Sequence, residues 1–566
     1  MRLRPFALSL IILAAACGID RGASSGENGG TMVITISGDA EGFLPPITSQ
    51  VPSAQVEAQL FDKLAEPGLG LNTIGDVGFE PRLAKSWSWT PDSLSIAFSI
   101  DPRARWHDGQ RLTARDVRFT WQVYADTATG SPTRPLIASI DSVTVRDSLT
   151  AVFWFSHRAA EQFFDATYQM RIIPEHRLAS VPRAELRTAP FMRHPVGSGP
   201  FRFVSWRDRQ AITLEANPDY YRGRPHLDRV IWSVAPDPQS NVLRFLAGEV
   251  DLVEFLRPPD MAELPKHPEL KAVPYPSLGY YYLLFNERDP KNPLAPHPLF
   301  GSRELRRALS MALDRPKLVK SVFDTLASVG HGPITKSIAT FDSTIVLLPY
   351  APDSARRILD ALGWRDANGD GIREKNGRPL AFTLIIPSSS LPRRQAAQLI
   401  QEELKQFGVK VEIEMADFPT TNQKVKARLF DAWINGLSLD PSPGSIRQSW
   451  SSASATPDGS NVGSYQSPVF DAYVDSAVRQ MDPVKAKAYF RQAYVTIVGD
   501  APAIWLYEPA SIAGMQRRIH PTGMRADAWG VNLAEWSIPP GERTARDRVG
   551  AAPPAPPEAP AAPAKP

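Results

Sequence analysis

The sequence has very few of the residues that most often bind metals or form cross-links. Its 566 residues include one cysteine and nine histidines. A single cysteine excludes a disulfide within the chain and a cysteine-based zinc or iron–sulfur site. The histidines lack the His-Glu-x-x-His spacing of zinc proteases, and no Walker motif for nucleotide phosphates is present. We therefore expect no cofactor and no metal site.

The chain also has little net charge and no long apolar run in its body. It carries 63 basic and 60 acidic residues without blocks of one sign, which argues against a nucleic-acid-binding protein. Beyond the N-terminal segment no apolar run reaches the roughly 18 residues of a membrane span. The hydrophobic fraction of 43% is that of a globular protein, and the length requires two or three folded parts.

The first residues have the layout of a secretory signal. Two arginines precede the apolar run Phe6–Ala16, which is too short to span a bilayer of about 30 Å. Small residues then lead directly to Cys17, an arrangement that resembles a bacterial lipoprotein signal. We expect residues 1–17 to be a signal peptide with a lipidated cysteine and residues 18–30 to be a flexible tether. A plain signal peptide with a free thiol is the alternative.

Hydrophobic patterns alternate between strand and helix along the body. Strands are predicted at 32–37, at 94–100 and at 143–155, the last folded around a turn at 146–147. The run Arg303–Leu313 repeats apolar residues on one stripe and predicts a helix. An Asp-x-Pro sequence then ends this helix and starts another.

The clearest unit is a strand, a helix and a second strand. Leu380–Ile386 is a strand of the buried type, Arg394–Phe407 is an amphipathic helix that Gly408 ends, and Val409–Met415 alternates like a strand. This order predicts a right-handed parallel βαβ unit. The predicted fold class is therefore α/β with mixed sheets.

Three local patterns could carry chemistry, and each has a simpler structural explanation. Asp366–Glu374 begins like an EF-hand calcium loop, but Gly377 stands where the final glutamate should be, so we interpret it as a tight turn. His107–Gly109 is interpreted as a turn, and Gly197–Pro200 as a kinked entry to a strand. An export signal and 9% aromatic residues without a catalytic motif favour a binding protein over an enzyme.

Five stretches resemble the extracytoplasmic solute-binding proteins of ABC importers, in the peptide/nickel class called family 5. They are residues 81–121, 197–232, 248–251, 282–322 and 440–502. The first contains PRLAKSW and WHDGQRLTARDV, the second GSGPFRF, and the fourth RELRRALSMALDRPKLVKSV. The five occur in the family's order and together cover nearly the whole mature chain.

The resemblance implies a two-lobed, periplasmic-binding-protein-like fold of type II, with mixed sheets and an extra third domain. The implied parts are lobe I at 31–59, 195–283 and 500–548, the extra domain at 60–194, lobe II at 284–499, and a Pro/Ala-rich disordered tail at 549–566. Two crossings between the lobes, at 277–286 and 500–508, would form the hinge.

The resemblance also implies a function. The protein would be a substrate-binding lipoprotein, not an enzyme, held outside the cytoplasmic membrane by the lipid on Cys17. It would capture peptides or a related small solute and deliver it by lobe closure to an ABC permease with separate ATPase subunits. It would act as a monomer without a cofactor. Two alternatives stay open: a hydrolase, peptidase or glycosidase, on the same scaffold, and a sensory or chaperone-like binder.

Ligand contacts are expected on lobe II and near the hinge. Peptide-binding members often carry an aspartate three residues before an Asp-Pro pair, where it binds the α-amine of the peptide. In Asp440-Pro441 that place is taken by Leu437, which disfavours ordinary peptides with a free amine. Blocked peptides, opine-like compounds, sugars and other solutes stay open. The expected ligand contacts are Trp433, Asn435, Leu437, Asp440, Trp450, Tyr280 and Tyr281.

Overall fold

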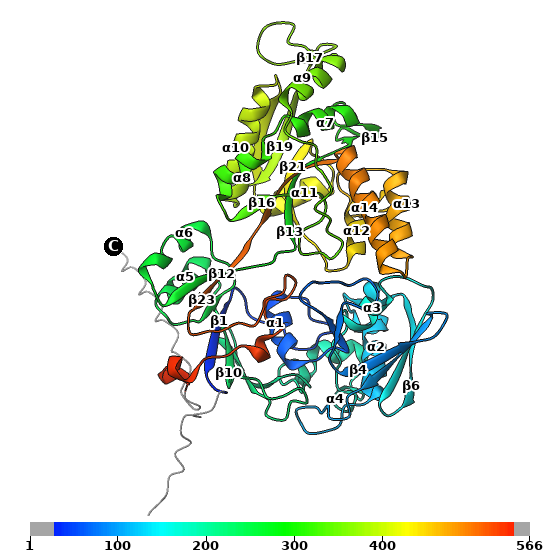
Figure 1. Ribbon diagram of the computed structural model, residues 1–566, viewed down its shortest axis with the longest axis vertical. Helices are drawn as coiled ribbons and strands as arrows, with labels where there is room; N and C mark the ends of the chain where they lie inside the picture. The colour runs from blue at the N-terminus through cyan, green and yellow to red at the C-terminus, as the bar shows by residue number, and fades with distance from the viewer. Residues whose placement is uncertain (1–27, 548–566) are drawn as a thin grey trace, which may run out of the picture.

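The computed structural model describes residues 28–547, so the signal segment with Cys17 and the tail at 549–566 lie outside the described range. Figure 1 shows three bodies, one at the top of the view and two side by side below it. Each body is built on its own sheet, of seven, six and four strands. The predicted α/β class with mixed sheets is confirmed.

Lobe I, the lower body that contains β1, is built on the seven-stranded sheet. Its order is β12-β23-β11-β1-β10-β9-β8, with β1 parallel to both neighbours. All six residues of β1 are buried, as expected for a strand covered on both faces. Its elements are β1 (Thr31–Ile36), α1 (Val51–Leu60), β8 (Phe201–Arg207), β9 (Ala211–Ala216), β10 (Arg229–Val234), α5 (Pro238–Leu246), β11 (Leu252–Val253), α6 (Pro258–Met261), β12 (Leu270–Tyr275) and β23 (Ser511–Gln516).

The extra domain is the other lower body, around an antiparallel sheet of order β4-β5-β7-β6. Its elements are β2 (Ala65–Pro67), β3 (Phe79–Pro81), β4 (Ala84–Trp89), β5 (Ser95–Ile100), α2 (Ala114–Ala125), β6 (Ile140–Asp147), β7 (Thr150–Phe155), α3 (Gln162–Thr167) and α4 (Glu175–Leu178). The turn predicted at 146–147 is wrong by two residues, because β6 continues to Asp147. There the Asp147 carboxylate accepts the backbone N–H of Leu149 at 2.9 Å and fixes the turn.

Lobe II is the upper body, with the six-stranded sheet β16-β22-β13-β21-β19-β20. Its elements are β13 (Gly279–Phe285), β14 (Arg288–Asp289), β15 (Asn292–Pro296), α7 (Arg303–Met311), α8 (Arg315–Phe323), β16 (Ala327–Val329), α9 (Pro352–Ala361), β17 (Glu374–Lys375), β18 (Arg378–Pro379), β19 (Ala381–Pro387), α10 (Leu391–Lys405), β20 (Lys410–Ala416), α11 (Phe418–Lys426), β21 (Ala432–Ser438), α12 (Ile446–Trp450), α13 (Pro468–Val478), α14 (Pro483–Asp500) and β22 (Ala503–Pro509). The predicted parallel βαβ unit is confirmed as β19–α10–β20. Gly408 follows α10 at φ +73°, a backbone conformation that favours glycine.

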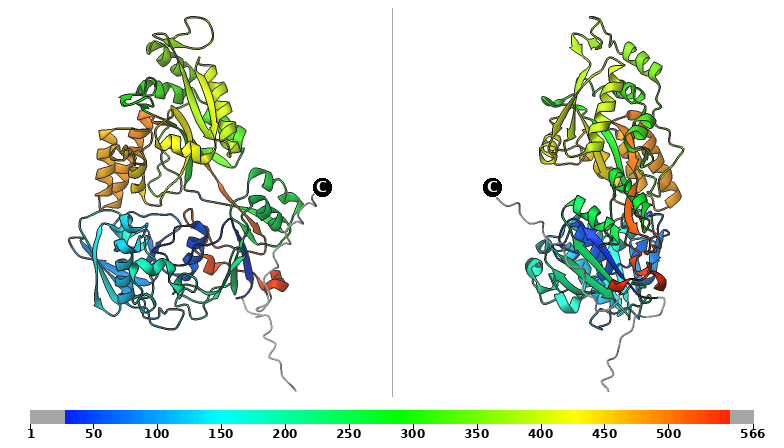
Figure 2. Two further views of the ribbon diagram at one scale, coloured as in Figure 1. Left: turned by 180° about the vertical axis from the view of Figure 1, so that it is seen from behind. Right: turned by 90° about the vertical axis from the view of Figure 1, so that its left-hand side faces the viewer.

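The chain crosses between lobe I and lobe II twice within the described residues. The crossings are the short links 276–278, between β12 and β13, and Ala510, between β22 and β23. The expected boundaries of lobe II, after residue 283 and before residue 500, therefore need correction. Both β13 and β22 belong to lobe II, because they pair with each other inside its sheet. Figure 2 shows the two linking strands, in green and orange, running between the bodies.

The Gly197–Pro200 sequence serves close packing, as expected for a kinked strand entry. A Cβ atom on Gly197 would lie 1.9 Å from the carbonyl oxygen of Leu60, and one on Gly199 would lie 2.4 Å from that of Gln59. His107 fastens the same segment, since its Nδ1 accepts the N–H of Gly197 and its Nε2 lies 3.0 Å from the Gly199 oxygen. Burial lowers the pKa of His107 to about 4, so the ring is neutral at pH 7.

Candidate functional site

A cavity of about 340 Å³, called the lobe I cavity, lies beside helix α1 where lobe I meets the extra domain. Residues of α1 and the segment just after it line one side, and the segment 525–535 lines another. Pro52 in the first turn of α1 fits a helix start, where its missing N–H costs nothing. Trp232 of β10 also lines the cavity, so the sheet, the helix and the C-terminal segment jointly enclose it.

A buried charged network occupies part of the cavity wall. Arg525 Nη2 lies 2.9 Å from carboxylate oxygens of both Glu66 and Asp527, and the Tyr168 hydroxyl donates to Asp527 at 2.8 Å. Lys63 Nζ lies 3.4 Å from Glu66 and 3.7 Å from the centre of the Tyr168 ring. Ion pairs in such a dry setting hold their geometry because breaking one leaves an uncompensated charge.

The network shifts the pKa values of its members in opposite directions. Burial by itself would raise the pKa of Glu66, but Lys63 and Arg525 outweigh it and lower the value to about 2. Burial lowers the pKa of Lys63 to about 8, although Glu66 opposes the change. At pH 7 Glu66 is therefore an anion shared by two cations, and Lys63 is still protonated.

Three carboxylates gather where the extra domain meets lobe II. Burial raises the pKa of Glu161 to about 7, with a further increase from Asp440. Burial likewise raises the pKa of Asp165 to about 8, aided by Glu161. Asp440 of lobe II is solvent-exposed on its surface, yet neighbouring protein atoms and Asp527 raise its pKa too. Neighbouring negative charges add to the effect of burial, because like charges disfavour full ionisation.

A second cavity, of about 500 Å³, lies beside the crossings. Tyr275, Pro276 and Ser277 line it from the first crossing, and Glu508, Pro509 and Ala510 from the second. Residues of β16 and of the extra domain complete the wall. The cavity is therefore lined by residues of both lobes and of the extra domain.

The structure brings most of the predicted ligand contacts together on β13 and β21. These strands are antiparallel, and Tyr280 is paired with Leu437. Two residues further along, Tyr282 is paired with Asn435 on the same face of the sheet. Asn435 donates its amide N–H to the Tyr282 hydroxyl at 3.0 Å, and Leu437 is half-buried. Tyr281 faces the other way and stacks on Tyr507, with ring centres 4.7 Å apart.

The other predicted contacts differ in exposure. Trp450 and Tyr280 are only 2% and 1% exposed, and the Trp450 indole N–H donates to the Tyr280 hydroxyl at 3.2 Å. Trp433 is also buried, against Phe430. This burial favours a core role for the three aromatic residues, while Asp440 remains open to solvent. Contact with a ligand stays a prediction for all seven residues.

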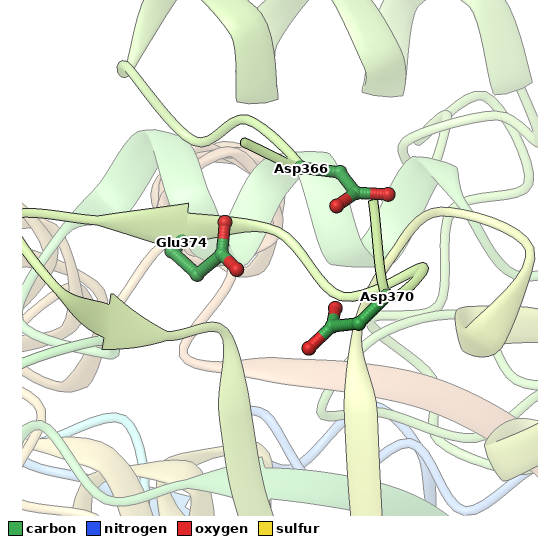
Figure 3. Close-up of side chains that lie close together, drawn as sticks. All are labelled: Asp366, Asp370 and Glu374. Carbon is green, nitrogen blue, oxygen red and sulfur yellow. The ribbon is translucent and has the colours of Figure 1, made fainter. Parts of the chain in front are cut away.

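A group of acidic side chains stands apart from both cavities, at the tip of lobe II. Asp366, Asp370 and Glu374 bring carboxylate oxygens within 4.8 Å of one another, as Figure 3 shows. Asp366 already accepts the backbone N–H groups of Gly369 and Gly371, and Glu374 accepts that of Ala367. These bonds support the interpretation as a tight turn.

Comparison with known proteins identifies the family. Residues 78–459 match the model of the "Bacterial extracellular solute-binding proteins, family 5 Middle". The chain belongs to this family. Oligopeptide-binding protein AppA of Bacillus subtilis (strain 168) is 28% identical over 525 residues, covering 90% of this chain and 93% of AppA. Heme-binding protein A of Haemophilus influenzae is 25% identical over 504 residues, covering 84% and 87%.

Solved structures show the same two-lobed fold. The structure of B. subtilis AppA in complex with a nonapeptide gives a TM-score of 0.69, covering 90% of this chain and 99% of that one. NikZ of Campylobacter jejuni in complex with Ni(L-His), 21% identical, gives 0.72 with the same coverage. The protein is therefore a solute-binding protein of this fold. No helix within residues 28–547 is long and apolar enough to cross a membrane.

Sequence reasoning missed the charged residues of the lobe I cavity. Arg525 and Glu66 are 459 positions apart in the chain, and Tyr168 comes from a third segment. No local motif joins them, since each sits in a different part of the sequence. Only the folded arrangement of lobe I and the extra domain places them side by side.

Proposed function

We propose that this protein is the solute-binding component of an ABC importer and that it captures peptides or peptide-like solutes between its lobes. The observation that carries the proposal is the pair of adjacent crossings. Tyr275 pairs with Ser511 at the edge of lobe I, and Tyr281 pairs with Tyr507 in lobe II. The links 276–278 and Ala510 therefore run side by side. Rotation about them moves lobe II without breaking either sheet.

Contacts far from the crossings support a closing motion. Thr73 Oγ1 donates to the Pro441 carbonyl at 3.1 Å, and the Ala160 N–H donates to the Val478 carbonyl at 2.9 Å. Both bonds join the extra domain to lobe II. They would break on opening and form again on closure, so a ligand that bridges the lobes favours the closed state.

The choice of a peptide-like solute rests on the family and on the kinship with AppA, an oligopeptide-binding protein. The half-buried Leu437 offers no counter-charge to a free α-amine. We therefore propose peptides whose amino end is blocked or is bound elsewhere. The permease and its ATPase subunits would be separate chains, and lipidation at Cys17 would hold the protein at the membrane surface.

The test is to purify the mature protein and identify what it carries. Denaturation followed by mass spectrometry should release a small solute, and the unfolded and refolded protein should bind that solute again with a rise in melting temperature. Small-angle scattering should show a smaller radius of gyration with the solute bound. A solute that returns chemically changed would indicate a hydrolase, and an unchanged radius on binding would contradict lobe closure.

A further inference from the structure

Some hydrogen-bond donors that line the lobe I cavity have no acceptor among the described residues, and one lining acceptor, Gln55 Oε1, has no donor. Lys63 is 7% exposed, and its ammonium makes one ion pair, to Glu66 at 3.4 Å, without a hydrogen bond within the described chain. Arg171 donates to the Phe61 carbonyl at 3.0 Å, and no carboxylate of residues 28–547 lies within ion-pair distance of its guanidinium. Trp232, 1% exposed, leaves its buried indole N–H unpartnered. All three residues line the cavity.

Three of the acidic residues that line the cavity are already engaged. Glu66 is shared by Lys63 and Arg525, and Asp527 accepts from Arg525 and from Tyr168. Asp62 accepts from the hydroxyls of Tyr220 and Ser198 with its two oxygens. None of these carboxylates is left to serve Arg171 or the remaining donors of Lys63.

Charged groups of both signs surround Lys63. Arg171 and Arg525 both lie near enough to Lys63 to disfavour its charged form, and Glu66 and Asp527 oppose them. Over the whole cavity the lining residues are balanced, with five basic and five acidic side chains, so a ligand carboxylate would be held by the local donors and not by a net positive charge. An added carboxylate would accept bonds from donors that are otherwise unsatisfied, in a setting where such bonds are strong.

We propose that the lobe I cavity binds a carboxylate of the ligand, held by Lys63 and Arg171. This inference rests on the proposed function and adds the chemical class of one end of the solute. Glu161 and Asp440 do not line the cavity, but Asp440 lies near enough to Lys63 and Asp527 to interact with both, so it competes with a ligand carboxylate for Lys63. The carboxylate can be the C-terminus of a peptide or an acidic side chain.

The experiment compares three libraries of N-acetylated peptides of two to six residues on the mature protein, after the resident solute has been removed. The first has free C-termini and lacks Asp and Glu, the second is the same library amidated, and the third is amidated but contains Glu. Peptides retained through gel filtration are counted by mass spectrometry. We expect at least ten-fold more free-acid than amidated peptide, and retention of the third library would assign the carboxylate to a side chain.

Variants of Lys63 and Arg171 test whether these two residues cause the preference for free-acid peptides. Lys63→Met and Arg171→Gln should each reduce the ratio of free-acid to amidated peptide at least five-fold, while Lys63→Arg should preserve it. Lys405→Met, at an exposed position of α10, is the matched control and should leave the ratio unchanged. Arg171 is only half-buried, so its variant keeps the test valid should Lys63→Met fail to fold.

The outcomes separate the two proposals. Equal retention of free-acid and amidated peptides would overturn the carboxylate site and leave peptide binding standing. Retention of none of the libraries would overturn the binding of peptides with a blocked amino end, and this inference with it. An unchanged ratio in both Lys63→Met and Arg171→Gln would show that the carboxylate binds elsewhere.

Discussion

Glu161 of the extra domain accepts the backbone N–H of Gly444 in lobe II at 3.2 Å. Gly444 belongs to the short 3₁₀ turn Pro443–Ser445, which is separated from Asp440-Pro441 only by Ser442. The bond therefore fastens the domain to the lobe next to a second carboxylate. Because Asp440 and burial both raise the pKa of Glu161 to about 7, the strength of this contact should depend on pH near neutrality.

The first prediction concerns that pH dependence. The folded protein keeps Glu161 protonated up to about pH 7, whereas the unfolded chain loses the proton near its ordinary pKa of 4.5. The folded state thus binds more protons between these values, and its stability falls as pH rises through this window. Glu161→Gln removes the effect and should stabilise the protein at pH 8 by about 3 kcal/mol, with little change at pH 4.

Thermal unfolding at pH 4 and pH 8 checks this prediction. The control is Glu185→Gln, which changes an exposed glutamate of the same domain and should behave like the wild type at both pH values. An equal change in melting temperature for Glu161→Gln at the two pH values would contradict the titration, since it would indicate a packing effect alone.

The sequence predicted the parts of the fold that depend on local patterns. The β19–α10–β20 unit was predicted because each element carries its own periodicity and Gly408 marks the helix end. The lobe boundaries were displaced because nothing local distinguishes β13 as a strand of lobe II from a strand of lobe I. Only its pairing with β21 and β22 assigns β13 to lobe II.

The site was harder to predict than the fold for the same reason. Tyr280 and Trp450 are aromatic residues in a region where the family suggests a cleft, yet they hydrogen-bond to each other in the core. A sequence cannot tell an aromatic core from an aromatic cleft, since both need the same side chains. Lys63 gave no signal because its surroundings come from Tyr168 and Arg525, far away in the chain.

The second prediction concerns the close approach of two segments in lobe I. Gly197→Ala would place a Cβ atom 1.9 Å from the Leu60 carbonyl oxygen, a backbone atom that cannot move freely. We expect a loss of about 3 kcal/mol or more in the free energy of unfolding, measured by denaturant titration. Gly70→Ala is the control, because nothing lies within 4 Å of its added methyl group. Equal midpoints for the two variants would contradict the packing argument.

The third prediction concerns Cys17, which lies outside the described residues. If its thiol carries the lipid, Cys17→Ser should move the protein from the membrane fraction to the soluble extracytoplasmic fraction and abolish labelling by a radioactive fatty acid. Stable anchoring needs two or more acyl chains, so partial retention is not expected. Immunoblotting of the fractions gives the answer, and a variant that stays membrane-bound would disprove the lipid anchor.

The fourth prediction concerns the missing counter-charge on β21. Leu437 is half-buried opposite Tyr280, where an aspartate would offer a carboxylate to an α-amine. Leu437→Asp should therefore raise the retention of tripeptides with a free amine about ten-fold relative to N-acetylated ones, which corresponds to about 1.4 kcal/mol. The matched control is Ser438→Asp, because the next residue of a strand faces the opposite side and Ser438 is exposed. Mass spectrometry of peptides retained by each variant measures the ratio. If both variants raise this ratio equally, the gain comes from general electrostatic attraction, and position 437 does not specifically bind the amino end of the ligand.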